Sequence, residues 1–212
     1  MNAVSTQGQE TEDPARLASL IAARLCHDLV SPLGAIGNGV ELLEMSGEFP
    51  RIAKSPELVL ISESVRAARA RIRFYRIAFG AAATDQRVSV SEIAQLLEEH
   101  VHGGRLTIQT EAAADLSRLD ARLLLLAVMC LESALPWGGR VLICRGGEGW
   151  RLVAEAQRTR PEPELWALLN GGGSSAGIAP ADVHFTMLAT LAAEAGRAVS
   201  WELDATGAEM SF

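Results

Sequence analysis

Residues 55–80 carry an apolar pattern with a strict heptad repeat. The apolar positions alternate in steps of three and four, at Leu58, Ile61, Val65, Ala68, Ile72, Tyr75 and Phe79. Such a stripe is typical of a helix that packs in a coiled coil or a helical bundle. Ser55 and Pro56 provide a start for this helix, because serine is a good N-cap and proline suits the first helical position. We therefore expect a long helix whose apolar side needs a partner.

A second long helix is predicted just before it, from Pro14 to about Met45. Asp13 and Pro14 provide its start, and Ser46 and Gly47 its end. Its apolar positions, again three and four residues apart, are Ala18, Ala22, Leu25, Leu29, Leu33, Ile36, Val40 and Leu43. Two helices joined by a loop of about ten residues form an antiparallel hairpin. Because one hairpin cannot cover both stripes, we expect two copies of the chain to pair as a four-helix bundle.

The pattern changes after residue 80. Helices are predicted at 89–101, 118–135, 162–169 and 181–195, and strands at 105–110, 140–144, 150–156, 197–203 and 209–212. This order predicts an α/β sandwich, a sheet covered on one face by helices. The fold class is therefore α+β. We divide the chain into a disordered N-terminus at 1–13, a helical-hairpin domain at 14–80, a linker at 81–87 and a sandwich domain at 88–212.

Composition excludes several classes of protein. The chain has 212 residues, 49% of them apolar, and a formal net charge of -7. This apolar content excludes a disordered protein, and the negative charge disfavours nucleic-acid binding. The longest run without a charged residue, 165–181, is broken by Asn170 and three glycines, so we expect no membrane span. The polar, acidic start has no signal-peptide pattern, which predicts a soluble, cytoplasmic protein.

The cysteines show no pattern of a bridged or metal-binding protein. Cys26, Cys130 and Cys144 are an odd number at unrelated spacings, and each lies in an apolar run. Free cysteine packs there as a small hydrophobic residue. We therefore expect no disulfide, no metal site and a reducing compartment.

His27 differs from the other three histidines in its surroundings. It lies off the apolar stripe, on a helix face formed by Leu20, Arg24, His27, Ser31, Gly34, Asn38 and Glu41. Small neighbours leave the imidazole accessible, an acid (Asp28) follows directly, and Pro32 permits a bend about one turn later. Glycine is unfavourable inside a helix, so three of them need a reason, and the close approach of a partner is one. They are Gly34, Gly37 and Gly39.

The segment from His27 to Leu33, HDLVSPL, resembles the H box of histidine kinases. In that family the histidine accepts a phosphoryl group and the following acid assists. The order of the chain is similar as well, with a helical-hairpin dimerisation domain before a domain ordered like the kinase ATP-binding domain. Residues 124–139 resemble the N box, and residues 176–200 resemble the last glycine-rich box with the helix behind it.

The likeness fails at the nucleotide-binding boxes. Met129 and Ser133 stand where the N box supplies asparagines for magnesium and nucleotide. The D-x-G-x-G box is replaced by EAQRTR at 155–160, and the glycine-rich loop at 171–177 lacks the Lys and Thr of a phosphate loop. We therefore expect no bound ATP, metal or other cofactor, and a histidine that is loaded by another protein.

This combination resembles the ChpT-type histidine phosphotransferases of alphaproteobacteria, over nearly all of residues 14–212. The resemblance implies a dimer that shuttles phosphoryl groups between aspartates of receiver domains, those of a hybrid histidine kinase and of response regulators, with magnesium supplied by the receiver. His27 is then the phosphoacceptor, through Nε2, and Asp28 orients and stabilises its ring. Contacts with the receiver are expected at Arg24, Ser31, Gly34, Asn38, Arg158 and Arg160.

Several alternatives remain open. Arg24 and Ser31 fit simple solvated positions equally well, and a stripe of arginines at 66, 69, 73 and 76 is most often a solvated face, although it could steer an acidic receiver. No role is expected for His100, His102 or His184, which lack ligand spacing. The rival functions are an active histidine kinase with an atypical nucleotide site, and a non-catalytic dimeric scaffold that only binds receivers.

Overall fold

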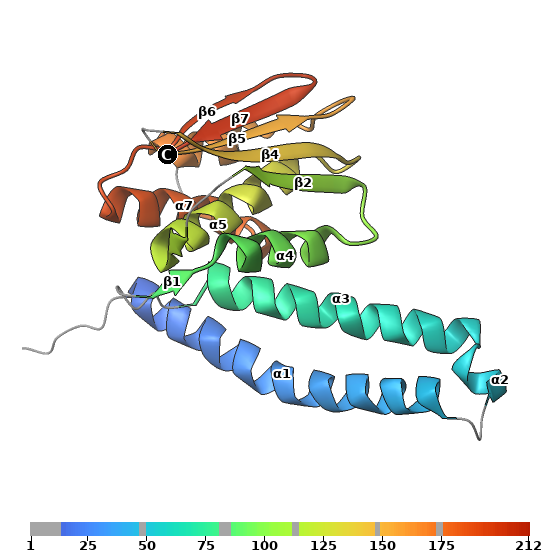
Figure 1. Ribbon diagram of the computed structural model, residues 1–212. Coiled ribbons are helices and arrows are strands. Elements are labelled where there is room, and N and C mark those ends of the chain that lie inside the picture. Colours follow the sequence, from blue (N-terminus) through green and yellow to red (C-terminus); the bar gives the residue numbers. More distant parts are fainter. Residues whose placement is uncertain (1–13, 47–49, 81–85, 112–114, 147–148, 173–175) are drawn as a thin grey trace, which may run out of the picture.

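A computed structural model describes residues 14–46, 50–80, 86–111, 115–146, 149–172 and 176–212. Figure 1 shows a long helical hairpin beneath a unit in which helices cover one face of a sheet. The expected α+β class, with a hairpin followed by an α/β sandwich, is confirmed. The segment expected to be a disordered N-terminus, 1–13, lies outside the described residues, as does Asp13, the expected helix start.

The hairpin consists of α1 (Pro14–Met45) and α3 (Pro56–Ala78). Ser55 caps α3 as expected, because its side chain accepts a hydrogen bond of 3.2 Å from the backbone nitrogen of Leu58. A short helix, α2 (Pro50–Ala53), lies in the connection and was not expected. Four residues are too few to show a helical period, so the sequence pattern does not predict α2.

The contact between α1 and α3 is made by small and apolar side chains. On α1 the buried positions are Ser19, Cys26, Gly37 and Val40. A Cβ atom added at Gly37 would lie 3.0 Å from Nη1 of Arg69 and 3.5 Å from Cγ1 of Val65. Gly37 therefore serves the packing of this hairpin rather than the approach of a partner, which corrects the expectation for this glycine. Gly34 and Gly39 do face open space.

The α/β unit is built on a five-stranded sheet. The strand order is β2-β4-β5-β7-β6, with β2 parallel to β4 and the other pairs antiparallel. The strands are β2 (Leu106–Glu111), β4 (Gly139–Gly146), β5 (Gly149–Glu155), β6 (Ser200–Leu203) and β7 (Gly207–Ser211). A separate ladder pairs β1 (Arg87–Val88) with β3 (Leu116–Ser117). Strands of two residues carry no alternation, so this ladder was not expected.

Helices cover the face of the sheet that is turned toward the hairpin (Figure 1). They are α4 (Val90–Val101), α5 (Arg118–Ala134) and α7 (Val183–Glu194), with the short α6 (Pro163–Ala167) at the side. The middle of α5, residues 123–128, is fully buried. A helix that is apolar on all sides must be surrounded by protein, and α5 accordingly packs against the sheet, α3 and α7.

The end of α3 joins the hairpin to this core. Phe74, Ile77 and Ala78 are buried in the core of the α/β unit, on a face of α3 outside the heptad stripe. Two guanidinium groups of α5 reach the end of the helix: Arg118 donates to the carbonyl of Arg76 and Arg122 donates to that of Ala78, each at 3.4 Å. Cations favour helix C-termini, where carbonyls lack helical partners. The junction between α3 and the α/β unit is thus held by apolar packing and by two arginines that bind the carbonyls at the end of α3.

Candidate functional site

His27 lies on α1, and its side chain is 81% exposed. It does not line any of the cavities found among the described residues. An imidazole this open can be reached by a large molecule, such as another protein, without any movement of the chain. The site is therefore suited to a macromolecular partner rather than to a small enclosed substrate.

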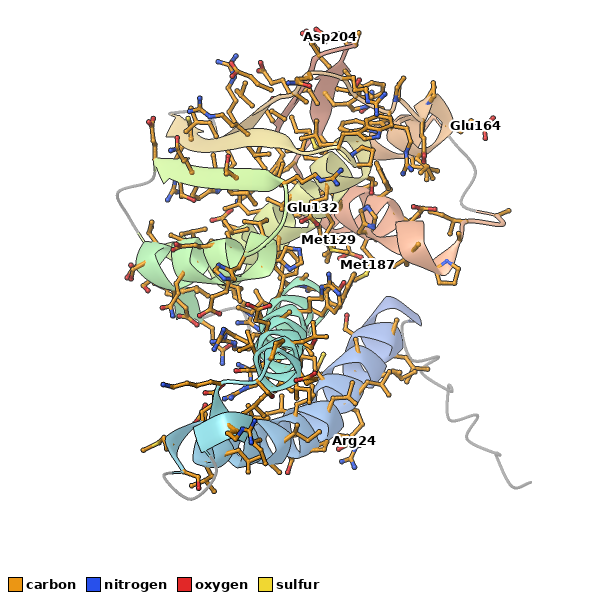
Figure 2. All side chains as sticks on the ribbon, turned by 90° about the vertical axis from the view of Figure 1, so that its right-hand side faces the viewer. Arg24, Met129, Glu132, Glu164, Met187 and Asp204 are labelled. Atoms are coloured by element: carbon orange, nitrogen blue, oxygen red, sulfur yellow. The ribbon has the colours of Figure 1, made fainter. Side chains whose placement is uncertain are left out.

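A chain of polar contacts links His27 to two neighbours on the same helix. Nδ1 of His27 lies 3.2 Å from Oδ1 of Asp28, and Oδ2 of Asp28 accepts a hydrogen bond of 2.8 Å from Nε of Arg24. The hydrogen bond with His27 lowers the pKa of Asp28 below its ordinary value, and the charge and hydrogen bond of Arg24 lower it further. Asp28 is therefore ionised at neutral pH and is held at both oxygens. Figure 2 shows Arg24 projecting from α1 on the outside of the hairpin.

This arrangement determines which ring nitrogen is reactive. An ionised carboxylate only accepts hydrogen bonds, so Nδ1 of His27 must carry the proton of the contact with Asp28. In the neutral ring Nε2 then has a free lone pair. Nε2 is therefore the candidate nucleophile, and Asp28 is the candidate group that orients the ring.

The rest of the His27 face is open, as expected. Ser31 and Asn38 are exposed, and a Cβ atom at Gly34 would touch nothing within 4 Å. Helix α1 continues through Pro32. Because proline has no N–H, the carbonyl of Asp28, four residues earlier, lacks its helical hydrogen bond. The helix thus lacks one backbone hydrogen bond next to His27 but does not end there.

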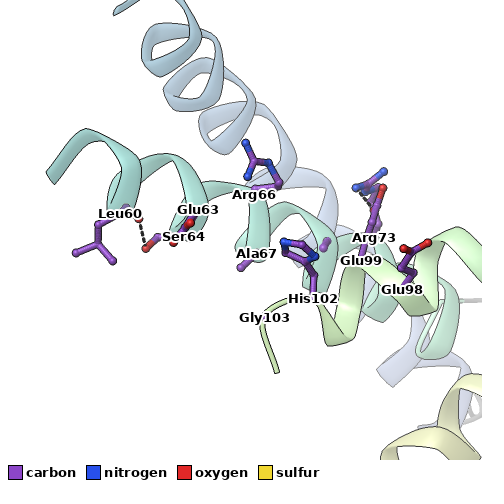
Figure 3. A pocket seen from close by; sticks show the side chains of 11 residues that line it. Leu60, Glu63, Ser64, Arg66, Ala67, Arg73, Glu98, Glu99, His102 and Gly103 are labelled. Carbon is purple, nitrogen blue, oxygen red and sulfur yellow. Dashed lines mark hydrogen bonds and ion pairs between the residues drawn. The ribbon is translucent and has the colours of Figure 1, made fainter. Parts of the chain in front are cut away.

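The arginine stripe of α3 has partners inside the chain. Arg69 contacts the region of Gly37, and Arg73 forms an ion pair with Glu99 of α4 (Figure 3). Burial raises the pKa of the Cys26 thiol, and the charge of Arg76 acts in the opposite direction. Arg69 and Arg73 of the stripe thus have partners within the fold.

Arg158 and Arg160 are not brought to His27. The guanidinium carbon of Arg158 lies 3.7 Å above the ring of Trp137, and Nε of Arg160 lies 2.9 Å from Oε1 of Glu162. Both contacts lie within the α/β unit. In the described part of the chain no contact joins either arginine to the hairpin, so any role in partner binding requires a partner that spans both parts.

Met129 and Ser133, the residues at the kinase N-box positions, contact other residues of the chain. The hydroxyl of Ser133 donates to the carbonyl of Met129 at 3.1 Å and lies 3.3 Å from Nε2 of His184. Met129 packs against the core, and His184, on α7, is buried. Neither Met129 nor Ser133 offers the amide oxygen that an asparagine would supply to magnesium. Among the described residues, no group of three His, Cys, Asp or Glu side chains is placed to hold a metal.

His100 and His184 take structural positions, as expected for histidines without ligand spacing. The ring of His100 stacks on Phe74 with centroids 3.9 Å apart, and its Nε2 lies 3.2 Å from Oε2 of Glu132. This residue therefore joins α3, α4 and α5. His102 is exposed.

A cavity of about 490 Å³ is lined by residues of α3 and of the end of α4 (Figure 3). Leu60, Ala67 and Ala70 form its apolar part, and charged side chains, among them Arg73 and Glu99, form its rim. His27 is not among the lining residues. The cavity is thus a feature of the junction and not part of the region around His27.

Comparison with known proteins identifies the family. Residues 90–207 match the family described as the histidine phosphotransferase C-terminal domain. The chain belongs to the histidine phosphotransferase family. It is similar to the protein phosphotransferase ChpT of Brucella abortus, with 31% identity over 207 residues, 92% of this chain and 93% of that protein. It is also similar to the 1.7 Å structure of a bacterial phosphotransferase, with a TM-score of 0.67, 26% identity, and coverage of 95% of this chain and 97% of that one.

Family membership confirms the expected resemblance, and phosphotransfer in a phosphorelay is the role of the chain. One part of the site was missed from the sequence. Arg24 was expected to meet the partner, or only solvent, whereas the structure pairs it with Asp28. The spacing of four residues between these opposite charges was the available signal, because such residues are neighbours on a helix.

Proposed function

We propose that this phosphotransferase moves phosphoryl groups between the aspartates of receiver domains through a phosphohistidine at His27. The observation that carries this proposal is the exposed imidazole whose Nδ1 is engaged by Asp28 while Nε2 is free. The partners are the receiver domain of a hybrid histidine kinase and those of response regulators.

The transfer step follows from this geometry. Nε2 of His27 attacks the phosphorus of an aspartyl phosphate in line, the N–P bond forms, and the P–O bond to the aspartate breaks so that its carboxylate leaves. Positive charge develops on the imidazole, and the carboxylate of Asp28 stabilises it through the hydrogen bond at Nδ1. The reverse step returns the phosphoryl group to a second receiver. Positioning supplies most of the catalysis in such reactions.

Magnesium, in this proposal, enters with the receiver. Next to His27 the chain offers one carboxylate, Asp28, and both of its oxygens already accept hydrogen bonds. A magnesium ion prefers several oxygen ligands in octahedral geometry. His27 and its neighbours do not fit a metal site of their own, and no step above uses one.

The proposal treats the chain as unable to use ATP. Its support is the chemistry at the N-box positions, where Met129 and Ser133 are engaged by the core and by His184. An autokinase is the competing function. Incubation with γ-labelled ATP and magnesium should leave the protein unlabelled and its melting temperature unchanged, whereas a clear rise in melting temperature would show binding to the folded state.

We also propose that two copies pair through the hairpin. Leu25, Leu29, Ile36 and Leu43 of α1 and Ile61 of α3, which we call the open apolar face, are 40–58% exposed in the single chain. Monomeric proteins rarely leave a large contiguous apolar patch in water. A second hairpin would cover this face and leave His27 open, because His27 points to another side of α1.

The central experiment compares His27→Ala with His102→Ala. Each protein is mixed with a receiver that carries a labelled aspartyl phosphate, and then with a second receiver. We expect acid-labile label on the wild type and on His102→Ala, and none on His27→Ala, which should remain folded. Label that passes through His27→Ala, or that maps to another histidine, contradicts the assignment. A protein that binds the receiver without ever carrying label is a scaffold.

A further inference from the structure

Arg24 and Asp28 form an ion pair whose geometry is tied to His27. Nε of Arg24 donates to Oδ2 of Asp28 at 2.8 Å, while Oδ1 of the same carboxylate faces Nδ1 of His27 at 3.2 Å. Each oxygen of Asp28 thus has a different partner: Arg24 for Oδ2 and His27 for Oδ1. Arg24 itself is largely solvent-exposed, with 74% of its side chain accessible.

Helix geometry alone does not bring the side chains of His27 and Asp28 into contact. Consecutive residues of an α-helix point about 100° apart, so residues i and i+1 do not face each other. Their side chains meet only when both adopt particular rotamers. Helical side chains lean toward the preceding turn, and Arg24 lies there, three residues before His27 and four before Asp28. Arg24 can therefore hold Asp28 in the rotamer that brings Oδ1 to the imidazole.

Helix stability alone is a weak reason for this pair. In the more favourable order the acidic residue precedes the basic one by four positions, whereas here the arginine comes first. Both side chains are exposed, and exposed ion pairs contribute little to folding. The pair does, however, engage the carboxylate that sets the tautomer of the ring.

We propose that Arg24 is a positioning residue of the phosphotransfer reaction: by holding Oδ2 of Asp28 it directs Oδ1 to Nδ1–H of His27 and keeps Nε2 as the nucleophilic nitrogen. The inference rests on the proposed role of His27. It replaces the earlier expectation that Arg24 contacts the receiver or the phosphoryl group, because it assigns the action of Arg24 to Asp28.

The first test measures the ring without any reaction. Long-range ¹H–¹⁵N correlation spectra report which nitrogen of His27 carries the proton. We expect mainly the Nδ1–H tautomer in the wild type, a mixture in Arg24→Gln, partial restoration in Arg24→Lys, and no change in the control Arg51→Gln, an exposed arginine on α2. An unchanged tautomer in Arg24→Gln overturns the proposal.

The second test separates positioning from partner contact. With saturating phosphorylated receiver, Arg24→Gln should lower the maximal transfer rate about fivefold and leave the half-saturating receiver concentration unchanged. In an Asp28→Ala background the same change should have no further effect, because Arg24 acts through Asp28. A raised half-saturating concentration, or a full additional loss in that background, shows direct contact with the receiver or phosphoryl group and overturns the proposal.

The two proposals fail in different ways. If His27→Ala still transfers label, the proposed function is wrong whatever Arg24 does. If transfer depends on His27 while the tautomer and rate of Arg24→Gln match the wild type, only the positioning role of Arg24 is wrong.

Discussion

At the scale of single residues, the role of each histidine follows from its environment. His27 is open to solvent beside an ionised carboxylate, so its ring is both accessible and oriented. His184 has a buried side chain next to Ser133, and His100 stacks on Phe74, so their rings fill space in the core and at the junction. A histidine side chain can act as a nucleophile or fill space in a core, because burial and hydrogen bonding control which ring nitrogen is protonated and whether another molecule can contact the ring.

Replacing Asp28 by Asn should slow phosphotransfer without abolishing it. The amide can donate to Nδ1 as readily as it accepts from it, so it no longer selects the Nδ1–H tautomer, and it brings no charge to stabilise the imidazolium. We expect the maximal rate to fall about tenfold or more in single-turnover transfer from a phosphorylated receiver. The control Glu155→Gln, an exposed acid on the sheet, should keep the wild-type rate. An Asp28→Asn protein with the wild-type rate contradicts the role of the carboxylate.

His184 should make folding stability dependent on pH. Burial lowers its pKa below the ordinary value of 6.5. The unfolded chain therefore binds a proton at pH values where the folded chain does not, so the free energy of unfolding falls as the pH drops below about 6.5. In urea unfolding at pH 7.5 and 5.5, His184→Gln should show a smaller loss between the two values than the wild type. His102→Gln, at an exposed position, should show the wild-type loss. Equal losses in all three proteins would rule out this contribution.

At the scale of elements, α3 packs against different parts of the chain with two of its faces. In its heptad stripe, Val65 lies against Gly37 of α1 and Ile61 belongs to the open apolar face. Phe74, Ile77 and Ala78 enter the core of the α/β unit, and the last stripe residues, Tyr75 and Phe79, pack against that core. Arg118 and Arg122 of α5 bind the carbonyls at its end, and Arg73 pairs with Glu99 of α4. The helix that packs against α1, which carries His27, is therefore also the helix that contacts the core of the α/β unit.

The start of α3 offers a stability test with a matched control. Ser55→Ala removes the side chain that accepts from the backbone nitrogen of Leu58, and we expect a loss of about 1 kcal/mol in the free energy of unfolding. Ser64 lies inside the same helix and donates to the carbonyl of Leu60 (Figure 3). Because alanine is the better residue in a helix interior, Ser64→Ala should be neutral or stabilising by about 0.5 kcal/mol. Urea denaturation measures both, and effects of the same sign would contradict the assigned cap.

At the scale of the whole molecule, the single chain leaves the open apolar face uncovered. By length and composition alone, α1 could cross a membrane over Leu17–Met45, and only 11% of the most apolar window is buried. This segment contains Arg24 and Asp28, and charged side chains are costly inside a bilayer. Pairing of two hairpins would cover the apolar side chains while His27, Asp28 and Arg24 stay in water, which supports the proposed dimer.

The dimer is tested by placing a charge on the open apolar face. Ile36 is 49% exposed in the single chain, so Ile36→Asp should disturb the isolated hairpin little but place two carboxylates in a paired bundle. We expect sedimentation to show a dimer for the wild type, and a dissociation constant raised at least about a hundredfold for Ile36→Asp. Leu42→Asp, at an exposed position off the stripe, should remain dimeric. A wild-type protein that is monomeric and floats with phospholipid vesicles would favour the membrane instead.

The local elements and the exposed position of His27 beside Asp28 could be predicted from the sequence, because both depend on residues close together in the chain. The periods of α1, α3, α4 and α5 and the cap of α3 are short-range signals, and His27, Asp28 and Pro32 fall within two turns of one helix. The short elements α2, β1 and β3 could not be predicted, since they contain too few residues to show a period.

Only the tertiary structure decided how side chains from different elements, or in particular rotamers, come together. It assigned Gly37 to the packing of α1 on α3, and it joined the end of α3 to α5 through Arg118 and Arg122. It also placed Arg158 over Trp137 rather than beside His27. Periodicity states which face of a helix is apolar, but not which element covers that face or which of several acceptors an arginine reaches. Those outcomes depend on distances between residues far apart in the chain and on rotamers, and they exist only once the elements have packed.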